Sequence, residues 1–170
     1  MDIFMEKIVK RRKNIKDQLL TAGVIFGTLV LMLIALNIQA LAAMGFNMLI
    51  VVGLGYAAYL IITSRNIEYE YAVTNGDLDI DKIISQRKRK RIFSANCKSF
   101  EIVAKVKSEH YTQQYKSFKN KIDCSGFIDG DNVYFVVLQY KNEQTILFFE
   151  PSEKMLQNFR TFIPRKVFTD

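Results

Sequence analysis

The sequence predicts an α+β membrane protein. A two-helix transmembrane hairpin is followed by an antiparallel β-barrel or sandwich of about seven strands, closed by a C-terminal helix. Three observations support this fold class. No Asp, Glu, Lys or Arg occurs between Asp17 and Arg65. Short segments of alternating polar and apolar residues fill most of the chain after Arg65, and an apolar stripe of helical spacing follows Pro151.

The N-terminal segment, residues 1–18, is basic and is predicted to lie in the cytoplasm. It carries a net charge of +3 and residues 65–170 carry +4, which gives the +7 of the whole chain. A basic chain can bind nucleic acid, but basic residues that directly precede an apolar run indicate membrane topology instead. We therefore expect an integral membrane protein with no nucleic-acid partner.

Residues 19–63 are predicted to form the transmembrane hairpin, with spans at about 19–36 and 44–62. A spanning helix needs about 20 apolar residues, because each residue rises about 1.5 Å through a hydrocarbon core of about 30 Å. Basic residues flank the hairpin at 10–13 and at Arg65, whereas the connecting turn has none. The positive-inside rule then places both the N- and C-termini in the cytoplasm, in a multi-pass protein of the cell membrane.

A cleaved signal peptide is the competing interpretation, because Ala40-Leu41-Ala42 resembles a cleavage site. The apolar core before this site is longer than the usual length of about 7–15 residues, and a second apolar run follows at once. We therefore expect an uncleaved hairpin.

Small residues recur at a four-residue spacing in both spans. Gly23 and Gly27 form a GxxxG pair in the first span, and Gly53 and Ala57 repeat the spacing in the second. Small side chains let helix backbones approach closely, so these faces either pack the two helices of one hairpin together or mediate association between copies. We favour packing within the hairpin; the alternative is a homo-oligomeric membrane scaffold.

A β domain is predicted at 66–164, followed by a tail at 165–170. Its first element is a β-hairpin around Asn75-Gly76, the dipeptide that most strongly indicates a two-residue turn. With that turn, Thr74 faces Asp77 and Glu70 faces Asp81. The buried face then consists of Tyr71, Val73, Leu78 and Ile80.

The opposite face of this hairpin is acidic, with Glu70, Asp79 and Asp81 among its residues. Like charges across a ladder are destabilising, so a positive group is expected beside them. We favour the basic run at 87–91 as a third strand over a bound divalent cation, because cation sites of this kind are normally built on curved loops. Cys97, Cys124 and His110 show no metal-ligand spacing, so we expect no metal and no cofactor.

Further strands are predicted at 100–106, 122–127, 133–140 and 144–149. A helix is predicted to start at Glu150-Pro151-Ser152 and to end at Pro164. Its apolar stripe consists of Met155, Leu156, Phe159, Phe162 and Ile163.

About seven strands closed by one helix resemble the pleckstrin-homology (PH) fold. The run Tyr69-Glu70-Tyr71 followed by residues 74–80 resembles the first hairpin of bacterial PH-like domains that are tethered to short transmembrane hairpins. The order of basic tail, two helices, hairpin and basic run is similar to that of an uncharacterised bacterial membrane-protein family of unknown function. Phosphoinositide-binding PH domains have a long basic loop where this chain has only Asn75-Gly76, so the resemblance does not imply inositide recognition.

No catalytic constellation is evident in the sequence, and we expect no enzyme. His110 follows Ser108 and Glu109, but neighbours in sequence do not by themselves make a nucleophile and its base.

We expect instead an interaction module that docks a protein partner at the membrane, through an exposed strand edge or the groove beside the closing helix. The alternative partner is an anionic lipid surface, which attracts clustered basic residues at about 1 kcal/mol per charge. The residues expected to contact lipid or partner are Arg87, Lys88, Arg89, Lys90 and Arg91.

Overall fold

The computed structural model describes residues 4–39, 43 and 45–169. The chain divides into two compact units, a helical unit at 13–66 and a β unit formed by residues up to 12 together with 67–170. The resemblance to a cleavage site at Ala40–Ala42 and the first residue of the second predicted span, Met44, lie outside the described residues.

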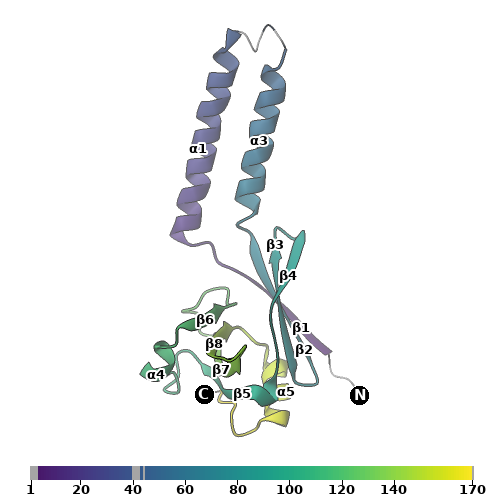
Figure 1. The fold of residues 1–170 in the computed structure, drawn as a ribbon, viewed down its shortest axis with the longest axis vertical. Coiled ribbons are helices and arrows are strands. Elements are labelled where there is room, and N and C mark those ends of the chain that lie inside the picture. The colour runs from purple at the N-terminus through teal and green to yellow at the C-terminus, as the bar shows by residue number, and fades with distance from the viewer. Residues whose placement is uncertain (1–3, 40–42, 44, 170) are drawn as a thin grey trace. The chain divides into compact units, whose positions relative to one another are not determined.

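The helical unit contains two apolar helices, α1 (Ile15–Asn37) and α3 (Asn47–Thr63), which run side by side (Figure 1). Asn14 caps the start of α1, and Asp17 completes the capping box. Among the described residues, α1 alone has both the length and the apolar composition of a spanning helix, since α3 is apolar but has 17 residues. One candidate spanning helix is therefore found, and the second predicted span is not confirmed.

The three glycines predicted to pack within the hairpin do not contact the neighbouring helix in the structure. A Cβ atom built on Gly23, Gly27 or Gly53 would meet no heavy atom within 4 Å. Gly55 faces the other helix instead, because its Cβ would lie 3.4 Å from Cε of Met32. GxxxG spacing alone did not identify which face of each helix meets its neighbour. Association between copies through Gly23, Gly27, Gly53 and Ala57 stays a prediction.

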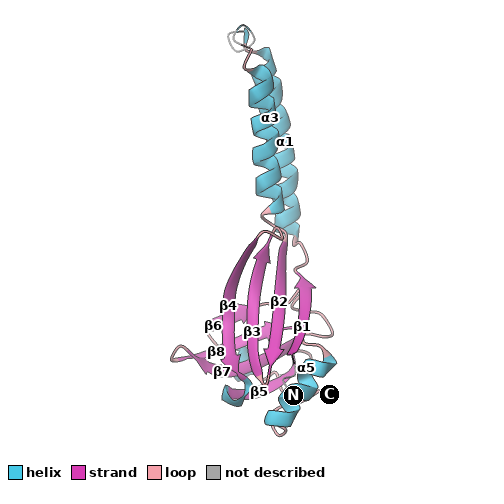
Figure 2. Ribbon diagram, turned by 90° about the vertical axis from the view of Figure 1, so that its right-hand side faces the viewer, coloured by secondary structure: helices cyan, strands magenta, loops and turns pink. Residues whose placement is uncertain are grey.

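The first sheet of the β unit is antiparallel, with four strands in the order β1-β2-β3-β4 (Figure 2). These strands are β1 (Phe4–Lys10), β2 (Ile67–Thr74), β3 (Asp77–Ile84) and β4 (Lys88–Asn96).

The predicted hairpin register between β2 and β3 is confirmed, because Thr74 pairs with Asp77 and Glu70 with Asp81. Asn75 and Gly76 both have positive φ, 50° and 87°, as a type I′ turn requires. The predicted buried face is also confirmed, since each of its side chains is fully buried; these residues are Tyr71, Val73, Leu78 and Ile80.

The N-terminal segment is not a separate tail. Residues 4–10 of the predicted segment 1–18 form strand β1, which pairs along its whole length with β2. The sequence did not indicate this strand because its pairing partner lies about 60 residues further along the chain, so no local turn points to it.

The second sheet has the order β5-β7-β8-β6 and is antiparallel except for the parallel pair of β6 and β8. Its strands are β5 (Phe100–Lys105), β6 (Asn120–Asp123), β7 (Tyr134–Tyr140) and β8 (Glu143–Phe149). The strand predicted at 122–127 therefore begins earlier and ends at Asp123, so the following residues form a loop. Neither sheet closes into a barrel within the described part of the chain.

Three short helical elements complete the β unit: η1 (Cys97–Ser99), α4 (Gln113–Lys116) and α5 (Glu153–Phe162). Ser152 caps α5, and its hydroxyl accepts a hydrogen bond from the amide of Met155. The main core lies between the inner faces of the two sheets, and α5 contributes Met155, Leu156 and Phe159 to it.

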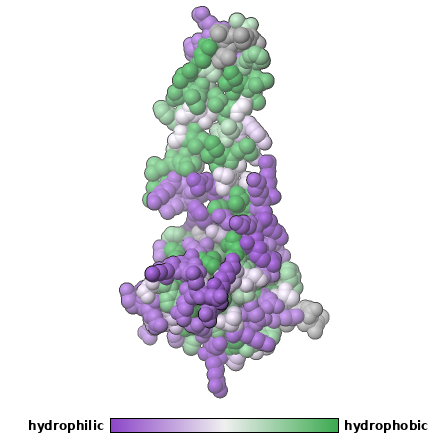
Figure 3. All heavy atoms as spheres, in the orientation of Figure 1, coloured by the Kyte–Doolittle hydropathy of each residue, from purple (hydrophilic) through white to green (hydrophobic). Residues whose placement is uncertain are grey.

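A smaller cluster lies on the other face of the second sheet, where Tyr111 and Tyr115 pack against Phe135. Surface hydropathy differs between the two units: apolar side chains cover most of the helical unit, and hydrophilic ones dominate the visible face of the β unit (Figure 3).

Candidate functional site

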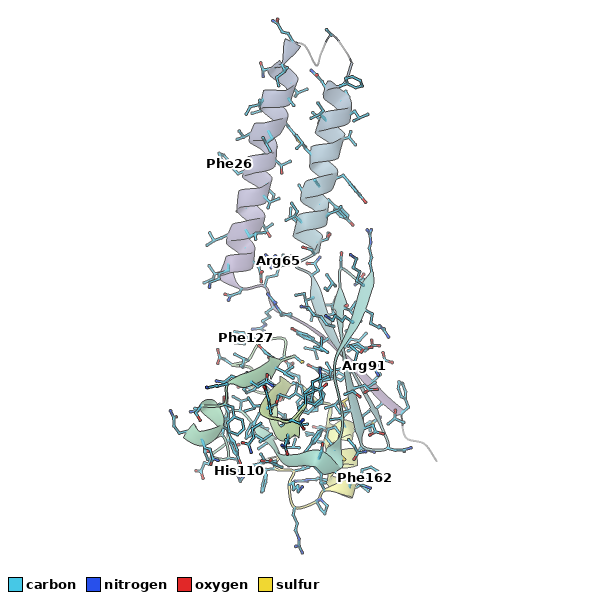
Figure 4. All side chains as sticks on the ribbon, in the orientation of Figure 1. Phe26, Arg65, Arg91, His110, Phe127 and Phe162 are labelled. Atoms are coloured by element: carbon cyan, nitrogen blue, oxygen red, sulfur yellow. The ribbon has the colours of Figure 1, made fainter. Side chains whose placement is uncertain are left out.

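The basic run predicted to contact lipid or a partner is divided by strand β4. Arg89 and Arg91 lie on the outer face of the first sheet, where they meet the acidic side chains. The Arg89 guanidinium approaches Oε2 of Glu70 at 2.6 Å as an ion pair without hydrogen-bond alignment. Arg91 pairs with Asp79 at 3.0 Å and with Asp81 at 2.9 Å (Figure 4).

The acidic face is thus neutralised from within the sheet, as the sequence favoured. Two further bonds complete it: Ser94 donates to Asp79 at 2.6 Å, and Asn96 donates to Asp77 at 2.7 Å. In the described ranges there is no group of three or more His, Cys, Asp or Glu residues that could hold a metal ion. The negative charge of this face is balanced by Arg89 and Arg91 of β4.

Glu70 is the most enclosed carboxylate of this face, with 8% of the residue exposed. A hydrogen bond with Glu6 raises its pKa above the ordinary value, and burial raises it further, while Arg89 opposes both effects. The raised pKa means that the Glu70 carboxyl keeps its proton to a higher pH than an ordinary glutamate does.

The remaining basic residues, Arg87, Lys88 and Lys90, are exposed at the β3–β4 turn and along β4. Strand β4 is one edge of the first sheet, and its pairing with β3 is interrupted by a register shift between Ile80 and Asp81. Charged side chains and a bulge are two ordinary ways to prevent an edge strand from pairing with another chain. The basic run therefore blocks this edge as well as neutralising the acidic face.

Strand β1 forms the opposite edge of the sheet and has a different character. Its register with β2 is continuous over seven residues. Phe4 and Ile8 lie on the outer face and are 63% and 52% exposed. An uninterrupted edge strand with exposed apolar side chains is a template for pairing with an added strand.

The hydrogen bonds show which backbone groups of β1 are available. The amide of Arg11 donates to the carbonyl of Ile67 at 2.9 Å, so Arg11 belongs to the hydrogen-bonded pairs of the ladder. Because such pairs alternate in an antiparallel ladder, Glu6 and Ile8 direct their N–H and C=O groups away from β2.

A groove of about 560 Å³ lies beside this edge. Lys7 of β1 lines one side, and Leu156 and Arg160 of α5 line another. Its charged residues are Lys7, Lys105, Arg160 and Glu153, an excess of positive charge. Arg160 is held in place by a hydrogen bond of 2.9 Å from Nη2 to Oγ1 of Thr169. The groove can accept a negatively charged side chain beside an apolar wall.

Tyr71 holds the two sheets together close to these surfaces. Its hydroxyl donates to the carbonyl of Cys124 at 2.6 Å and accepts from the amide of Glu150 at 3.2 Å. Burial raises the pKa of Tyr71 well above its ordinary value, so the hydroxyl stays neutral. Burial also raises the pKa of the Cys124 thiol to about 12, which keeps it protonated and unreactive.

The residues around His110 have local partners. The Ser108 hydroxyl donates to the carbonyl of Lys105 at 2.7 Å. The ring centroids of His110 and Phe168 lie 4.0 Å apart. Ser108 therefore stabilises a turn, and His110 packs against Phe168.

Sequence reasoning expected docking at an exposed strand edge or at the groove beside the closing helix, but it identified neither β1 as that edge nor the residues that line the groove. The segment at 4–10 reads Phe-Met-Glu-Lys-Ile-Val-Lys, in which polar and apolar residues come in pairs and do not alternate, so no strand periodicity marked β1. No sequence signal marked the groove, because Lys7, Lys105 and Arg160 lie far apart in the chain and meet only in the fold.

The two four-stranded sheets with α5 packed into their core define a PH-like β domain, joined here to an apolar helical unit. A scan against family models matches residues 1–169 to the family described as Bacterial PH-like domain (DUF6106). The chain belongs to this family, and the match covers the helical unit as well as the β unit. No curated protein matches the chain.

Proposed function

We propose that this chain is a membrane-anchored interaction module, whose PH-like domain docks an extended segment of a protein partner at the cytoplasmic surface of the cell membrane. One observation carries the proposal: the edge strand β1, whose pairing with β2 is uninterrupted, lies beside a basic groove. The anchor is a hairpin of α1 and α3, with both termini in the cytoplasm.

The helical unit supports the anchor. The 17 residues of α3 rise about 26 Å, at the lower end of what crosses a hydrocarbon core of about 30 Å. Large apolar side chains on both helices are exposed, among them Phe26 at 71% and Leu49 at 71%. Lipid is the solvent in which such a surface is stable. The basic residues 10–13 and Arg65 favour cytoplasmic termini.

The contrast between the two edges of the first sheet supports the docking site. Strand β4 begins with four consecutive basic residues and contains a bulge, whereas β1 has no bulge and its charged residues, Glu6, Lys7 and Lys10, are of mixed sign and interspersed with apolar ones. A fold that needed both edges closed would have comparable devices on each. The open edge is the one that borders the groove.

The chemistry of the edge defines the partner segment. Its backbone pairs with the outward N–H and C=O groups of Glu6 and Ile8, and its alternate side chains are apolar where they cover Phe4 and Ile8. On the other face, its side chains enter the groove. An Asp or Glu there meets Lys7, Lys105 and Arg160.

The test is selection of short random peptides on the full chain in detergent. Selected peptides should be extended and acidic, and should slow hydrogen exchange at the amides of Glu6 and Ile8. Ile8→Pro removes one outward N–H without breaking the bonds to β2, and should weaken binding about tenfold or more, through that lost bond and the ring at the edge. Ile8→Thr keeps the N–H and serves as the matched control.

Equal binding to the Ile8→Pro and wild-type chains, with both folded, would contradict docking at this edge. Selected peptides that protect amides outside β1 and bind independently of Ile8 would contradict it as well.

A further inference from the structure

The loop that follows β6 exposes two neighbouring apolar side chains. Phe127 is 45% exposed and Ile128 is 37% exposed. Elsewhere in the described part of the β unit, the exposed large apolar side chains are Phe4, Ile8 and Phe162, which are not adjacent in sequence. An apolar pair at a loop tip, rimmed by polar residues, indicates a contact surface.

This loop is fixed against the segment that leads into α1. The amide of Arg12 donates to the carbonyl of Gly126 at 2.8 Å. A side chain at Gly126 could not be accommodated, because its Cβ would lie 2.7 Å from the carbonyl oxygen of Lys10. On the other side, Oε1 of Glu150 accepts from the amide of Gly126 at 2.8 Å. The loop therefore has a defined place beside Lys10–Arg12.

Chain connectivity limits how far this loop can lie from the start of α1. Two residues, Lys13 and Asn14, separate Arg12 from the first helical residue, Ile15. At no more than about 3.6 Å per residue, three steps of chain span at most about 11 Å. If α1 enters the bilayer, Arg12 and the loop bonded to it lie near the headgroup layer.

The side chains of this region match the chemistry of a membrane interface. The Arg12 guanidinium carbon lies 5.4 Å from the ring centroid of Phe127. The Lys10 side chain is 77% exposed and its amine lies 3.5 Å from Oε1 of Glu68, a surface pair of the kind that contributes little and leaves the amine accessible. The loop contains two acidic residues nearby. Asp131 is paired with Lys107, which lowers the pKa of the Asp131 carboxyl. Asp129 lines the adjoining cavity. Aromatic rings at headgroup depth with basic residues beside them are typical of membrane-interface anchors.

We infer that Phe127 and Ile128 dip into the lipid interface beside the entry of α1, while Arg12 and Lys10 contact anionic headgroups. This inference rests on the membrane anchor of the proposed function and is independent of peptide docking at β1. The basic run at 87–91 has no part in it.

The chain contains no tryptophan, so one introduced residue reports on its own surroundings. The experiment places F127W in the full chain, reconstituted in phosphatidylcholine vesicles with phosphatidylglycerol and brominated lipid. F4W is the matched control, because Phe4 is an exposed phenylalanine at the far end of β1 from Lys10. Thermal melts of both variants verify folding.

We expect bromine to quench the F127W emission about threefold more than the F4W emission. Adding R12Q to F127W should reduce the quenching in anionic vesicles, whereas adding K154Q, which removes an exposed charge on α5, should not. Equal quenching of F127W and F4W, in chains that float with the vesicles, would overturn the inference and leave the anchor intact. Failure of the folded chain to float would overturn the anchor itself.

Discussion

The helical unit and the β unit treat their large apolar side chains in opposite ways. Phe26 of α1 is 71% exposed, whereas Phe93 of β4 is fully buried between the sheets. Both units contain large apolar side chains, but charged residues are absent from the stretch between Asp17 and Arg65. The β unit excludes water from its core, whereas the helical unit leaves its apolar side chains exposed, which agrees with the membrane anchor proposed above.

Truncating one phenylalanine in each unit should affect the stability of the β unit very differently. Phe93→Ala should lower the free energy of unfolding of the β unit by about 3–5 kcal/mol, because it leaves a cavity beside Tyr140, whose ring centroid lies 5.0 Å away. Phe26→Ala removes no core atoms and should change that free energy by less than about 0.5 kcal/mol. Denaturant unfolding of the full chain in detergent, followed by near-UV circular dichroism, measures both. Equal losses would show that the two units share one core.

A smaller effect should follow from removing one buried hydroxyl. Tyr71→Phe leaves the carbonyl of Cys124 and the amide of Glu150 without their partner, and should cost about 1–3 kcal/mol. The matched control is Tyr59→Phe in α3, where the tyrosine is 48% exposed and no core bond is lost. A Tyr71→Phe chain as stable as the wild type would show that water replaces the hydroxyl at this junction.

The features that the sequence predicted are those that depend on local signals. The charge-free stretch between Asp17 and Arg65 and the Asn75-Gly76 turn are local signals. The stretch contains two apolar helices, of which α1 is long enough to be a candidate span, and the turn lies where it was predicted. The hairpin register followed from the turn because alternation fixes which residues face the core, as Tyr71 and Ile80 show.

The parts that escaped prediction depend on contacts between distant segments. Strand β1 has no turn of its own, and it is ordered by pairing with β2. The groove joins Lys7 to Arg160, and no spacing rule links residues so far apart. In the helical unit, only the built helices show that Gly55 faces Met32 while Gly53 does not. The strand predicted at 122–127 ends at Asp123 in the structure, so Phe127 lies in a loop.

The smallest expected effect is a pH dependence of stability. It should be confined to the β unit, because the helical unit holds no acidic residue between Asp17 and Arg65. Glu70 has a pKa raised by its hydrogen bond with Glu6. The stability that a raised carboxyl pKa contributes is fully present below the ordinary pKa and is lost as the pH rises through the raised one. The free energy of unfolding of the wild type should therefore decline as the pH rises from the ordinary carboxyl pKa through the raised pKa of Glu70.

Glu6→Gln replaces the competing carboxyl by an amide, which can donate to ionised Glu70 and lowers its pKa. The variant should match the wild type in stability at low pH and exceed it near neutral pH by less than about 1 kcal/mol, since Arg89 already compensates part of the charge. Glu101→Gln, at an exposed position of β5, is the control and should leave the profile unchanged. Unfolding midpoints measured from acidic to neutral pH decide the matter. A wild-type decline that persists in Glu6→Gln would place its origin outside the Glu6–Glu70 pair. It would also show that ionisation of Glu70, the buried carboxylate of the outer face, does not set the stability of the first sheet.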